Sequence, residues 1–190
     1  MADALVAGIL VALLVGVAAT LYFVFGSFLF GAGYQPTPAR SAEAMLRLAR
    51  VGPGDRVVDL GAGTGALVFR AAEGCGAEVV GVEVEPIRVA VLRLRRWLSP
   101  ARRRITIEWG DLFRLDLSGA TVVAAFLWPH AMGRLAPRLA AELRPGSRLV
   151  SHYHPLPGYR PAAVDDRAKV YLYVAPFERD PAGGGPGAAP

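Results

Sequence analysis

The sequence predicts an α/β protein with a doubly wound, mostly parallel sheet, preceded by an N-terminal transmembrane helix. Three observations lead to this prediction. Short apolar runs alternate with amphipathic helical stretches between residues 39 and 174. A glycine-rich turn at residues 59–65 joins one apolar run to a helix. An uncharged apolar segment, residues 4–26, precedes the alternating part.

The N-terminal segment is apolar for long enough to cross a bilayer. No charged residue occurs between Asp3 and Arg40, and residues 4–26 are apolar except for Thr20. At about 1.5 Å per residue, this helix would reach roughly 35 Å, against a hydrocarbon core of roughly 30 Å. A cleaved signal peptide is the alternative, but it would carry a basic n-region and a shorter apolar core. We therefore expect a retained single-pass membrane anchor.

The charges that flank the anchor indicate its orientation. Arg40, Arg47 and Arg50 follow the apolar segment, and no basic residue precedes it. Because basic residues stay on the cytoplasmic side, we expect the rest of the chain to be cytoplasmic. Small residues recur at every fourth position of the anchor and would permit a homodimer through this helix, although a chain so rich in Ala and Gly forms such a stripe easily by chance. These residues are Ala4, Gly8, Ala12, Gly16 and Thr20.

Periodicity defines the elements that follow the anchor. Helices are predicted at 39–50, 65–73, 86–98 and 131–143, and strands at 56–60, 77–83, 105–109, 121–126, 148–151 and 170–174. Alternation of this kind gives a parallel sheet whose ligands bind at the carboxyl ends of the strands. From Pro181 the chain contains only Gly, Ala and Pro, so we expect disorder there. The expected parts are an anchor with a short linker at 1–33, one α/β domain at 34–178 and a disordered tail at 179–190.

The glycine-rich turn predicts a nucleotide-type ligand site. Gly61, Gly63 and Gly65 remove Cβ atoms where the backbone turns sharply and where a ligand approaches it. The segment also fits G-x-G-x-x-A, so a dinucleotide site is an alternative that the glycines do not exclude. Asp59 precedes the glycines and favours a ligand that is cationic at that point. S-adenosylmethionine carries an ammonium and a sulfonium there, whereas a dinucleotide carries a pyrophosphate.

Two further strands end in acids. Glu83 ends the strand at 77–83, where a carboxylate accepts hydrogen bonds from ribose hydroxyls. Asp111 and Leu112 follow the next strand, and we expect Asp111 to accept from an adenine amine while Leu112 covers a ring face. Three acid-terminated strands in this order therefore predict a nucleoside-type cofactor. The alternative is that Glu83 and Asp111 are solvated strand ends.

Composition limits the remaining possibilities. The net charge of +5 comes almost wholly from arginine, with Lys169 the only lysine. Such one-sided usage is typical of a coding bias, so the positive charge is poor evidence for nucleic-acid binding, and we expect no nucleic-acid partner. Cys75 is the only cysteine, which excludes an internal disulfide, and no His, Cys or acid spacing indicates a metal site. A basic stretch with Trp97 inside it is either a solvated helix face or a contact for RNA or anionic lipid, and the anchor favours lipid. Its basic residues are Arg93, Arg95, Arg96, Arg102, Arg103 and Arg104.

Four stretches together carry a family resemblance. Tyr34-Gln35-Pro36-Thr37-Pro38 matches a Y-x-P-T-P element, residues 59–65 are the glycine motif, Phe126-Leu127-Trp128-Pro129 matches an L-L-P-like strand end, and Ser151-His152 with Pro155 to Tyr159 matches V-S-H-x-x-P-x-P-G-W. On these residues the chain resembles class I S-adenosylmethionine-dependent methyltransferases. More narrowly, it resembles the archaeal-type protein lysine methyltransferases and their mitochondrial membrane-anchored relatives, which modify the ATP synthase c-subunit and the adenine nucleotide translocator.

The resemblance implies a Rossmann-like methyltransferase fold that binds S-adenosyl-L-methionine, with Tyr34 and Thr37 bordering the cofactor cleft. It also implies an apolar channel for a substrate lysine, on which Trp128, Pro129, His152 and Tyr34 would converge. An aromatic channel helps because a neutral lysine at pH 7 costs roughly 4.6 kcal/mol, and desolvation lowers that cost. Residues 27–33 connect the anchor to the Tyr34 element and span at most roughly 25 Å. If Tyr34 and Thr37 border the cleft, the reacting methyl group stays close to the membrane surface, so the expected partner is an integral membrane protein. A methyltransferase acting on a lipid or small amphiphile, or a non-enzymatic S-adenosylmethionine-binding protein, would share the cofactor residues.

Overall fold

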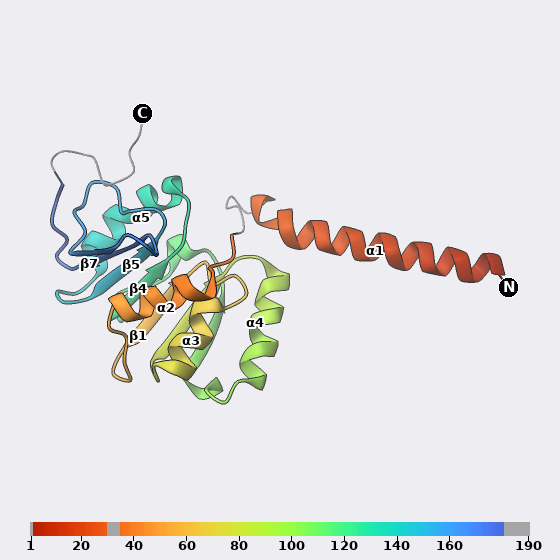
Figure 1. The fold of residues 1–190 in the computed structure, drawn as a ribbon, viewed down its shortest axis with the longest axis horizontal. Helices are drawn as coiled ribbons and strands as arrows, with labels where there is room; N and C mark the ends of the chain where they lie inside the picture. Colours follow the sequence, from red (N-terminus) through yellow and green to blue (C-terminus); the bar gives the residue numbers. More distant parts are fainter. Residues whose placement is uncertain (1, 30–34, 181–190) are drawn as a thin grey trace. The chain divides into compact units, whose positions relative to one another are not determined.

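The protein is described here by a computed structural model, which covers residues 2–29 and 35–180 (Figure 1). The chain divides into two compact units, Met1–Tyr34 and Gln35–Pro190. The first unit is helix α1 (Ala2–Leu29). Its segment Asp3–Tyr22 has a mean hydropathy of 2.7 and no buried residue. By length and composition this helix is long and apolar enough to cross a membrane. A signal sequence or the core helix of a soluble protein can have the same length and composition.

The second unit is built on one seven-stranded sheet. The strands are β1 (Arg56–Leu60), β2 (Glu78–Glu83), β3 (Ile105–Trp109), β4 (Val122–Ala125), β5 (Arg148–His152), β6 (Ala163–Asp165) and β7 (Val170–Val174). Their order across the sheet is β3-β2-β1-β4-β5-β7-β6. Strands β1 to β5 pair in parallel, whereas β7 is antiparallel to both β5 and β6. The predicted mostly parallel, doubly wound sheet is thus confirmed.

Helices cover both faces of the sheet (Figure 1). One apolar core joins the sheet to α2 (Ala39–Leu48), α3 (Ala66–Gly74) and α4 (Pro86–Leu98). A second core joins the other face to α5 (Pro129–Glu142). Both cores consist wholly of residues of the second unit. This unit therefore has the complete apolar interior that a domain needs to fold on its own.

The observed elements differ from the predicted ones mainly at their ends. The bounds of α4 and β7 agree with the prediction, while α2 ends at Leu48 rather than at residue 50. Strand β6 was not predicted, because its three residues are partly exposed and show no alternation. At the C-terminus, Arg179 bridges to Tyr159 and the Asp180 amide donates to the Gly158 carbonyl, so the folded unit extends beyond the boundary expected at residue 178. The rest of the expected tail lies outside the described residues.

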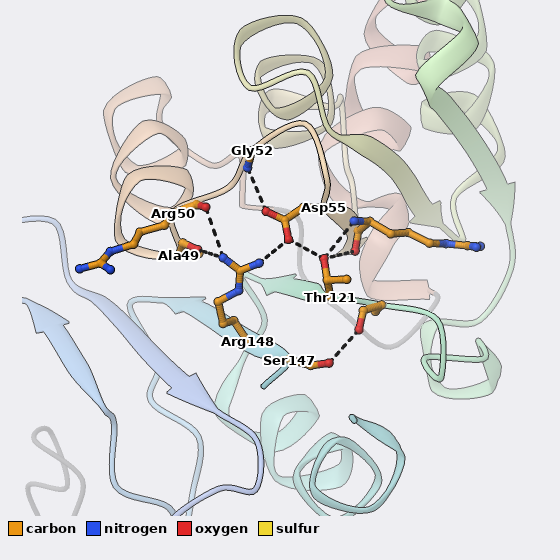
Figure 2. A network of polar contacts seen from close by, with 9 residues as sticks. Ala49, Arg50, Gly52, Asp55, Thr121, Ser147 and Arg148 are labelled. Atoms are coloured by element: carbon orange, nitrogen blue, oxygen red, sulfur yellow. Dashed lines mark hydrogen bonds and ion pairs between the residues drawn. The ribbon is translucent and has the colours of Figure 1, made fainter. Parts of the chain in front are cut away.

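Polar contacts tie together the amino ends of β1, β4 and β5 (Figure 2). One Asp55 oxygen accepts from the Thr121 hydroxyl at 2.7 Å and from the Arg148 guanidinium, and the other accepts from the Gly52 amide at 2.9 Å. Arg148 also donates to the Ala49 carbonyl at the end of α2. This network, which we call the Asp55–Arg148 network, fixes the amino edge of the sheet and leaves the carboxyl edge as the place for a ligand.

Candidate active site

The glycine-rich turn leaves the carboxyl end of β1 in a conformation that only glycine adopts easily. Gly61, Gly63 and Gly65 have φ angles of 80°, 56° and 88°. A Cβ atom on Gly65 would lie 2.5 Å from the Phe69 ring, so the first turn of α3 packs directly on the backbone there. The amides of Gly61 and Ala62 both donate to the Val82 carbonyl, at 3.0 and 2.8 Å. The turn is thus held against the end of the neighbouring strand β2.

Glu83 organises the glycine-rich turn from the end of β2. Its carboxylate is buried, and one oxygen accepts from the Gly63 amide at 2.8 Å. The other oxygen accepts from the amides of Val84 and Glu85, both at 3.0 Å. A carboxylate offers about four acceptor sites, so three are in use within the protein and roughly one is left for a ribose hydroxyl. The sequence predicted the ribose role, but it gave no sign of the hydrogen bond to the turn.

Asp59 is the second buried acid at this edge. Burial, and in addition the nearby Glu83 carboxylate, raise the pKa of Asp59 from 3.8 to about 7. A group in this state gains from any cation placed beside it, since an opposite charge favours the ionised carboxylate. The ammonium or sulfonium of S-adenosylmethionine supplies such a charge, whereas a pyrophosphate would raise the pKa further. The electrostatics of the turn therefore fit S-adenosylmethionine.

Asp111 and Leu112 lie beside this pair of acids, beyond the end of β3. The Gly110 amide donates to the Glu83 carbonyl at 3.1 Å, which holds the start of the loop against β2. Asp111 is exposed, and its side chain accepts from the Phe113 amide at 2.9 Å at the start of the 3-10 turn η2 (Leu112–Arg114). Leu112 is half-buried. The role of both residues in binding adenine stays a prediction.

Aromatic and imidazole rings gather after the carboxyl ends of β4 and β5. The Phe126 and His152 rings lie 4.5 Å apart, those of Trp128 and His154 6.0 Å apart, and those of Tyr153 and His154 5.1 Å apart. Trp128 is 48% exposed and Tyr153 58% exposed, so the cluster faces solvent on one side. We call these five residues the aromatic cluster. It lies at the same edge of the sheet as the glycine-rich turn, because Ala125 pairs with both Leu60 and Ser151.

His152 is the buried member of the aromatic cluster. Its Nδ1 lies 3.2 Å from the Lys169 carbonyl oxygen, and burial lowers the pKa of its imidazole. We assign the proton to Nδ1, which leaves a lone pair on Nε2. Tyr153 and Lys169 have φ angles of 65° and 52°, and the Tyr153 amide donates to the Lys169 carbonyl at 2.7 Å. Left-handed backbone at non-glycine residues is often retained at functional sites, so this corner is a candidate for one.

The other predicted site residues are placed less directly. Pro129 is exposed at the first position of α5, directly after Trp128, and Thr37 is half-buried ahead of α2. Tyr34 lies outside the described residues. Of the aromatic cluster, only Trp128 and His152 were predicted as site residues. Phe126, Tyr153 and His154 were not among the predicted site residues, although Phe126 belongs to the quoted strand-end motif and the other two directly follow His152.

Comparison with known proteins identifies the family to which this chain belongs. Residues 59–163, more than half of the chain, match the family model described as the ANTKMT methyltransferase domain. The protein-lysine N-methyltransferase of Saccharolobus islandicus is 37% identical over 150 residues, which cover 74% of this chain and 92% of that protein. The adenine nucleotide translocase lysine N-methyltransferase of Mus musculus is 37% identical over 132 residues, covering 69% of this chain and 57% of that protein.

A solved structure agrees with these matches. The RNA methyltransferase from Salinibacter ruber, in complex with S-adenosyl-L-homocysteine, is 35% identical and superposes with a TM-score of 0.74. The match covers 80% of this chain and all of that one. The dinucleotide alternative for the glycine motif is thereby excluded, since the similar proteins are methyltransferases rather than dehydrogenases.

Proposed function

This chain belongs to the ANTKMT methyltransferase family, a group of S-adenosylmethionine-dependent enzymes, and on that premise we propose that it methylates lysine side chains of membrane proteins at the cytoplasmic face. The observation that carries the proposal is the half-exposed aromatic cluster beside the cofactor edge. The names of the two relatives, both lysine N-methyltransferases, agree with it.

The cofactor is held by residues at the ends of β1, β2 and β3. S-adenosylmethionine, when bound, supplies a methyl group already activated by a sulfonium. Asp59 stabilises the positive charge of the ligand, and Glu83 holds the glycine-rich turn while it accepts from the ribose. Asp111 and Leu112 contact the base, and Thr37 borders the cleft. The protein therefore contributes position and charge, the two requirements of a reaction whose donor is already activated.

The aromatic cluster meets the particular difficulty of a lysine substrate. At pH 7 the amine is protonated, and its neutral form costs roughly 4.6 kcal/mol. The rings of Trp128 and Tyr153 would shield the bound amine from water, and this desolvation favours loss of its proton. Pro129 lends the rim of the channel a rigid apolar surface. The same surfaces then guide the neutral amine toward the reacting methyl group.

We assign to His152 the role of assisting that loss of a proton. Because Nδ1 donates to the Lys169 carbonyl, Nε2 carries the lone pair that accepts a proton from the amine, directly or through one water molecule. The lowered pKa of the imidazole keeps His152 neutral near pH 7 and ready to accept. The role is testable through His152→Gln, which should reduce kcat more than KM and shift the pH–rate profile to higher pH.

Helix α1 supplies the membrane part of the proposal. Its length and mean hydropathy allow it to span a bilayer, and the arginines after it favour a cytoplasmic catalytic domain. A short linker would keep the catalytic domain close to the membrane, where tethering raises the effective concentration of substrates in the same plane. Residues 31–190 alone, which keep Tyr34, should therefore bind S-adenosylmethionine as the full chain does, yet lose most methylation of membrane proteins.

The decisive experiment gives radiolabelled S-adenosylmethionine and the full chain to membranes from cells that lack this protein. Label should appear in the protein fraction, as methyllysine after hydrolysis, and Trp128→Ala should reduce it while leaving cofactor affinity unchanged. The control is Trp109→Ala, which removes another exposed tryptophan, from the edge strand β3. Label in the lipid fraction would identify a lipid methyltransferase instead, and a wild-type chain that binds S-adenosylmethionine without any transfer would identify a binding protein.

RNA is the second substrate class, since the Salinibacter ruber protein is described as an RNA methyltransferase. The two classes separate in one assay in which total RNA and membrane protein compete for the same label. Incorporation into RNA that survives protease treatment would overturn the lysine proposal. The assay also separates substrate choice from cofactor use, because both outcomes need the same bound S-adenosylmethionine.

A further inference from the structure

Helix α4 exposes an apolar stripe on the side that does not pack on the sheet. Val89 and Leu92 are buried, whereas Ile87 is 41% exposed, Leu94 59% and Leu98 66%. With the half-buried Val91, the positions 87, 91, 94 and 98 lie on one helical face, and Trp97, which is 70% exposed, adjoins it. We call Ile87, Val91, Leu94, Trp97 and Leu98 the α4 stripe. A soluble surface rarely gathers large apolar side chains in this way, which marks a contact site.

The charges carried by α4 and the segment that follows it are all of one sign. Between Pro86 and Arg104 the chain contains seven arginines and no acid (Arg88, Arg93, Arg95, Arg96, Arg102, Arg103 and Arg104). Arg93 and the three arginines of the 3-10 turn η1 (Arg102–Arg104) are exposed. The turn follows α4 after three residues, so its charges adjoin the end of the stripe at Leu98. The whole segment lies at the rim of the domain, because α4 packs on β2 and on the edge strand β3.

We propose that the α4 stripe and η1 form a docking surface for anionic lipid. Leu94, Trp97 and Leu98 enter the interface between headgroups and acyl chains, and the arginines of η1 bind lipid phosphates. A basic helix with tryptophan and leucine on its apolar face has the composition of helices that lie in a membrane surface. Each arginine near an anionic surface adds about 1 kcal/mol of attraction.

Charge and apolarity together favour lipid over other partners. Pairing of two copies of the chain through this face would bring the arginines of both copies together, and like charges oppose that contact. RNA would bind the arginines but would leave the large aliphatic side chains of the stripe in water. An anionic membrane takes up both kinds of side chain at once.

Vesicle binding of residues 35–190 tests the proposal without interference from α1, because this unit has its own core. The probes are vesicles of phosphatidylcholine and vesicles of an equal mixture of phosphatidylcholine and phosphatidylglycerol. We expect sedimentation with the mixed vesicles, little with the neutral ones, and weaker binding as salt is raised.

Two variants and a matched control assign the binding to this surface. The triple variant Arg102→Gln, Arg103→Gln, Arg104→Gln should bind mixed vesicles roughly 100-fold more weakly, from about 1 kcal/mol per charge. The variant Leu94→Gln, Leu98→Gln should lose binding to a similar degree. Arg144→Gln, Arg160→Gln and Arg167→Gln together remove the same charge from exposed positions elsewhere and should change little. Unchanged S-adenosylmethionine affinity in all three shows that they are folded.

The full chain in lipid nanodiscs gives an independent readout. Brominated anionic lipids should quench Trp97 fluorescence, so Trp97→Phe should remove most of the quenching while Trp109→Phe should keep it. Equal binding to both vesicle types, or an equal loss in the control, overturns the proposal. It is also overturned if the α4 variants bind lipid normally but fail to dimerise or to bind RNA, since the surface would then belong to that partner.

Discussion

The two edges of the parallel sheet place acids in opposite situations. At the amino edge, Asp55 accepts from Arg148, Thr121 and the Gly52 amide, so its charge is matched within the protein (Figure 2). At the carboxyl edge, Asp59 is buried beside a second acid, Glu83, and its pKa is raised to about 7. Only three residues separate the two aspartates along the chain. The first acid stabilises the fold, and the second is held ready for a cationic ligand at the expense of stability.

The comparison is sharpest when the same substitution is made at both edges. Asp59→Asn should raise the free energy of unfolding of the cofactor-free protein at pH 8 by up to about 4 kcal/mol, because a rise of the pKa from 3.8 to about 7 is about three units at 1.36 kcal/mol each. Asp55→Asn should lower it, since Arg148 then loses its charged partner. Denaturant unfolding of the two variants beside the wild-type chain provides the measurement.

The raised pKa of Asp59 determines how the stability of the protein changes with pH. Between pH 3.8 and about 7 the folded state binds more protons than the unfolded state, so stability falls as pH rises through this window. The gain from Asp59→Asn should therefore shrink as the pH is lowered toward 4. A variant that is less stable than wild type at pH 8 would show that Asp59 is matched in charge like Asp55, and the contrast between the edges would be lost.

Breaking the Asp55–Arg148 network from its cationic side should have the next largest effect. Arg148→Met leaves the mostly buried Asp55 carboxylate without its ion-pair partner and should cost about 3 kcal/mol of unfolding free energy. Arg160→Met removes the exposed pair with Glu178 and should cost little. Calorimetry should give the same S-adenosylmethionine affinity for Arg148→Met as for wild type at a temperature where both are folded. A large loss of affinity would mean that the two edges are coupled.

Glu83→Gln tests how the carboxyl edge is organised. The carboxamide offers one acceptor oxygen where the carboxylate accepts three amides, so the glycine-rich turn should loosen and a ribose contact should be lost. We expect S-adenosylmethionine affinity to fall by roughly 10- to 100-fold, the scale of hydrogen bonds to a charged group. Glu78→Gln, at the exposed start of the same strand, is the control and should bind normally. Normal binding by Glu83→Gln would remove Glu83 from the site.

The smallest expected effect is a dependence of cofactor affinity on pH. If the cation binds the ionised form of Asp59, whose pKa is about 7, affinity should fall about tenfold between pH 8 and pH 6. Titration calorimetry in buffers of different ionisation enthalpy should show about half a proton released on binding near pH 7 and nearly one at pH 6. In Asp59→Asn the affinity should be lower throughout and nearly independent of pH. A flat profile in wild type would assign the pH-sensitive group elsewhere.

Elements with strong local signals were predicted closely. Pro86 follows Glu85, whose side chain accepts from the Ile87 and Arg88 amides, and α4 begins and ends where its periodicity does. Strand β6 has only three residues, none of them buried, so neither its length nor an apolar run marks it in the sequence. An element can be predicted from the sequence where its own residues form a helix cap or a hydrophobic period, as in α4. It is missed where only pairing with a distant strand defines it, as in β6.

The site was predicted in the same uneven way. Asp59 and Glu83 stand out because each acid ends an apolar run, but the raised pKa of Asp59 arises from burial that the sequence does not display. Phe126 and His154 join the aromatic cluster because β4 and β5 pair in a particular register. The register of two strands depends on the whole sheet. Contacts between side chains of different strands therefore could not be predicted from the sequence of either strand alone.

Arg95 gives the lipid surface and the cofactor turn a shared component. It lies on α4 among the residues of the basic stretch, yet its guanidinium stacks 4.3 Å from the Phe69 ring and donates to the Thr64 carbonyl in the glycine-rich turn. A displacement of α4 on docking would thus be felt at Gly63 and Gly65, on either side of Thr64. Thermodynamic reciprocity then requires that whatever factor lipid applies to cofactor affinity, the cofactor applies to lipid affinity. Through Arg95, the membrane would then change the affinity of the enzyme for its cofactor, in addition to holding the enzyme near its substrates.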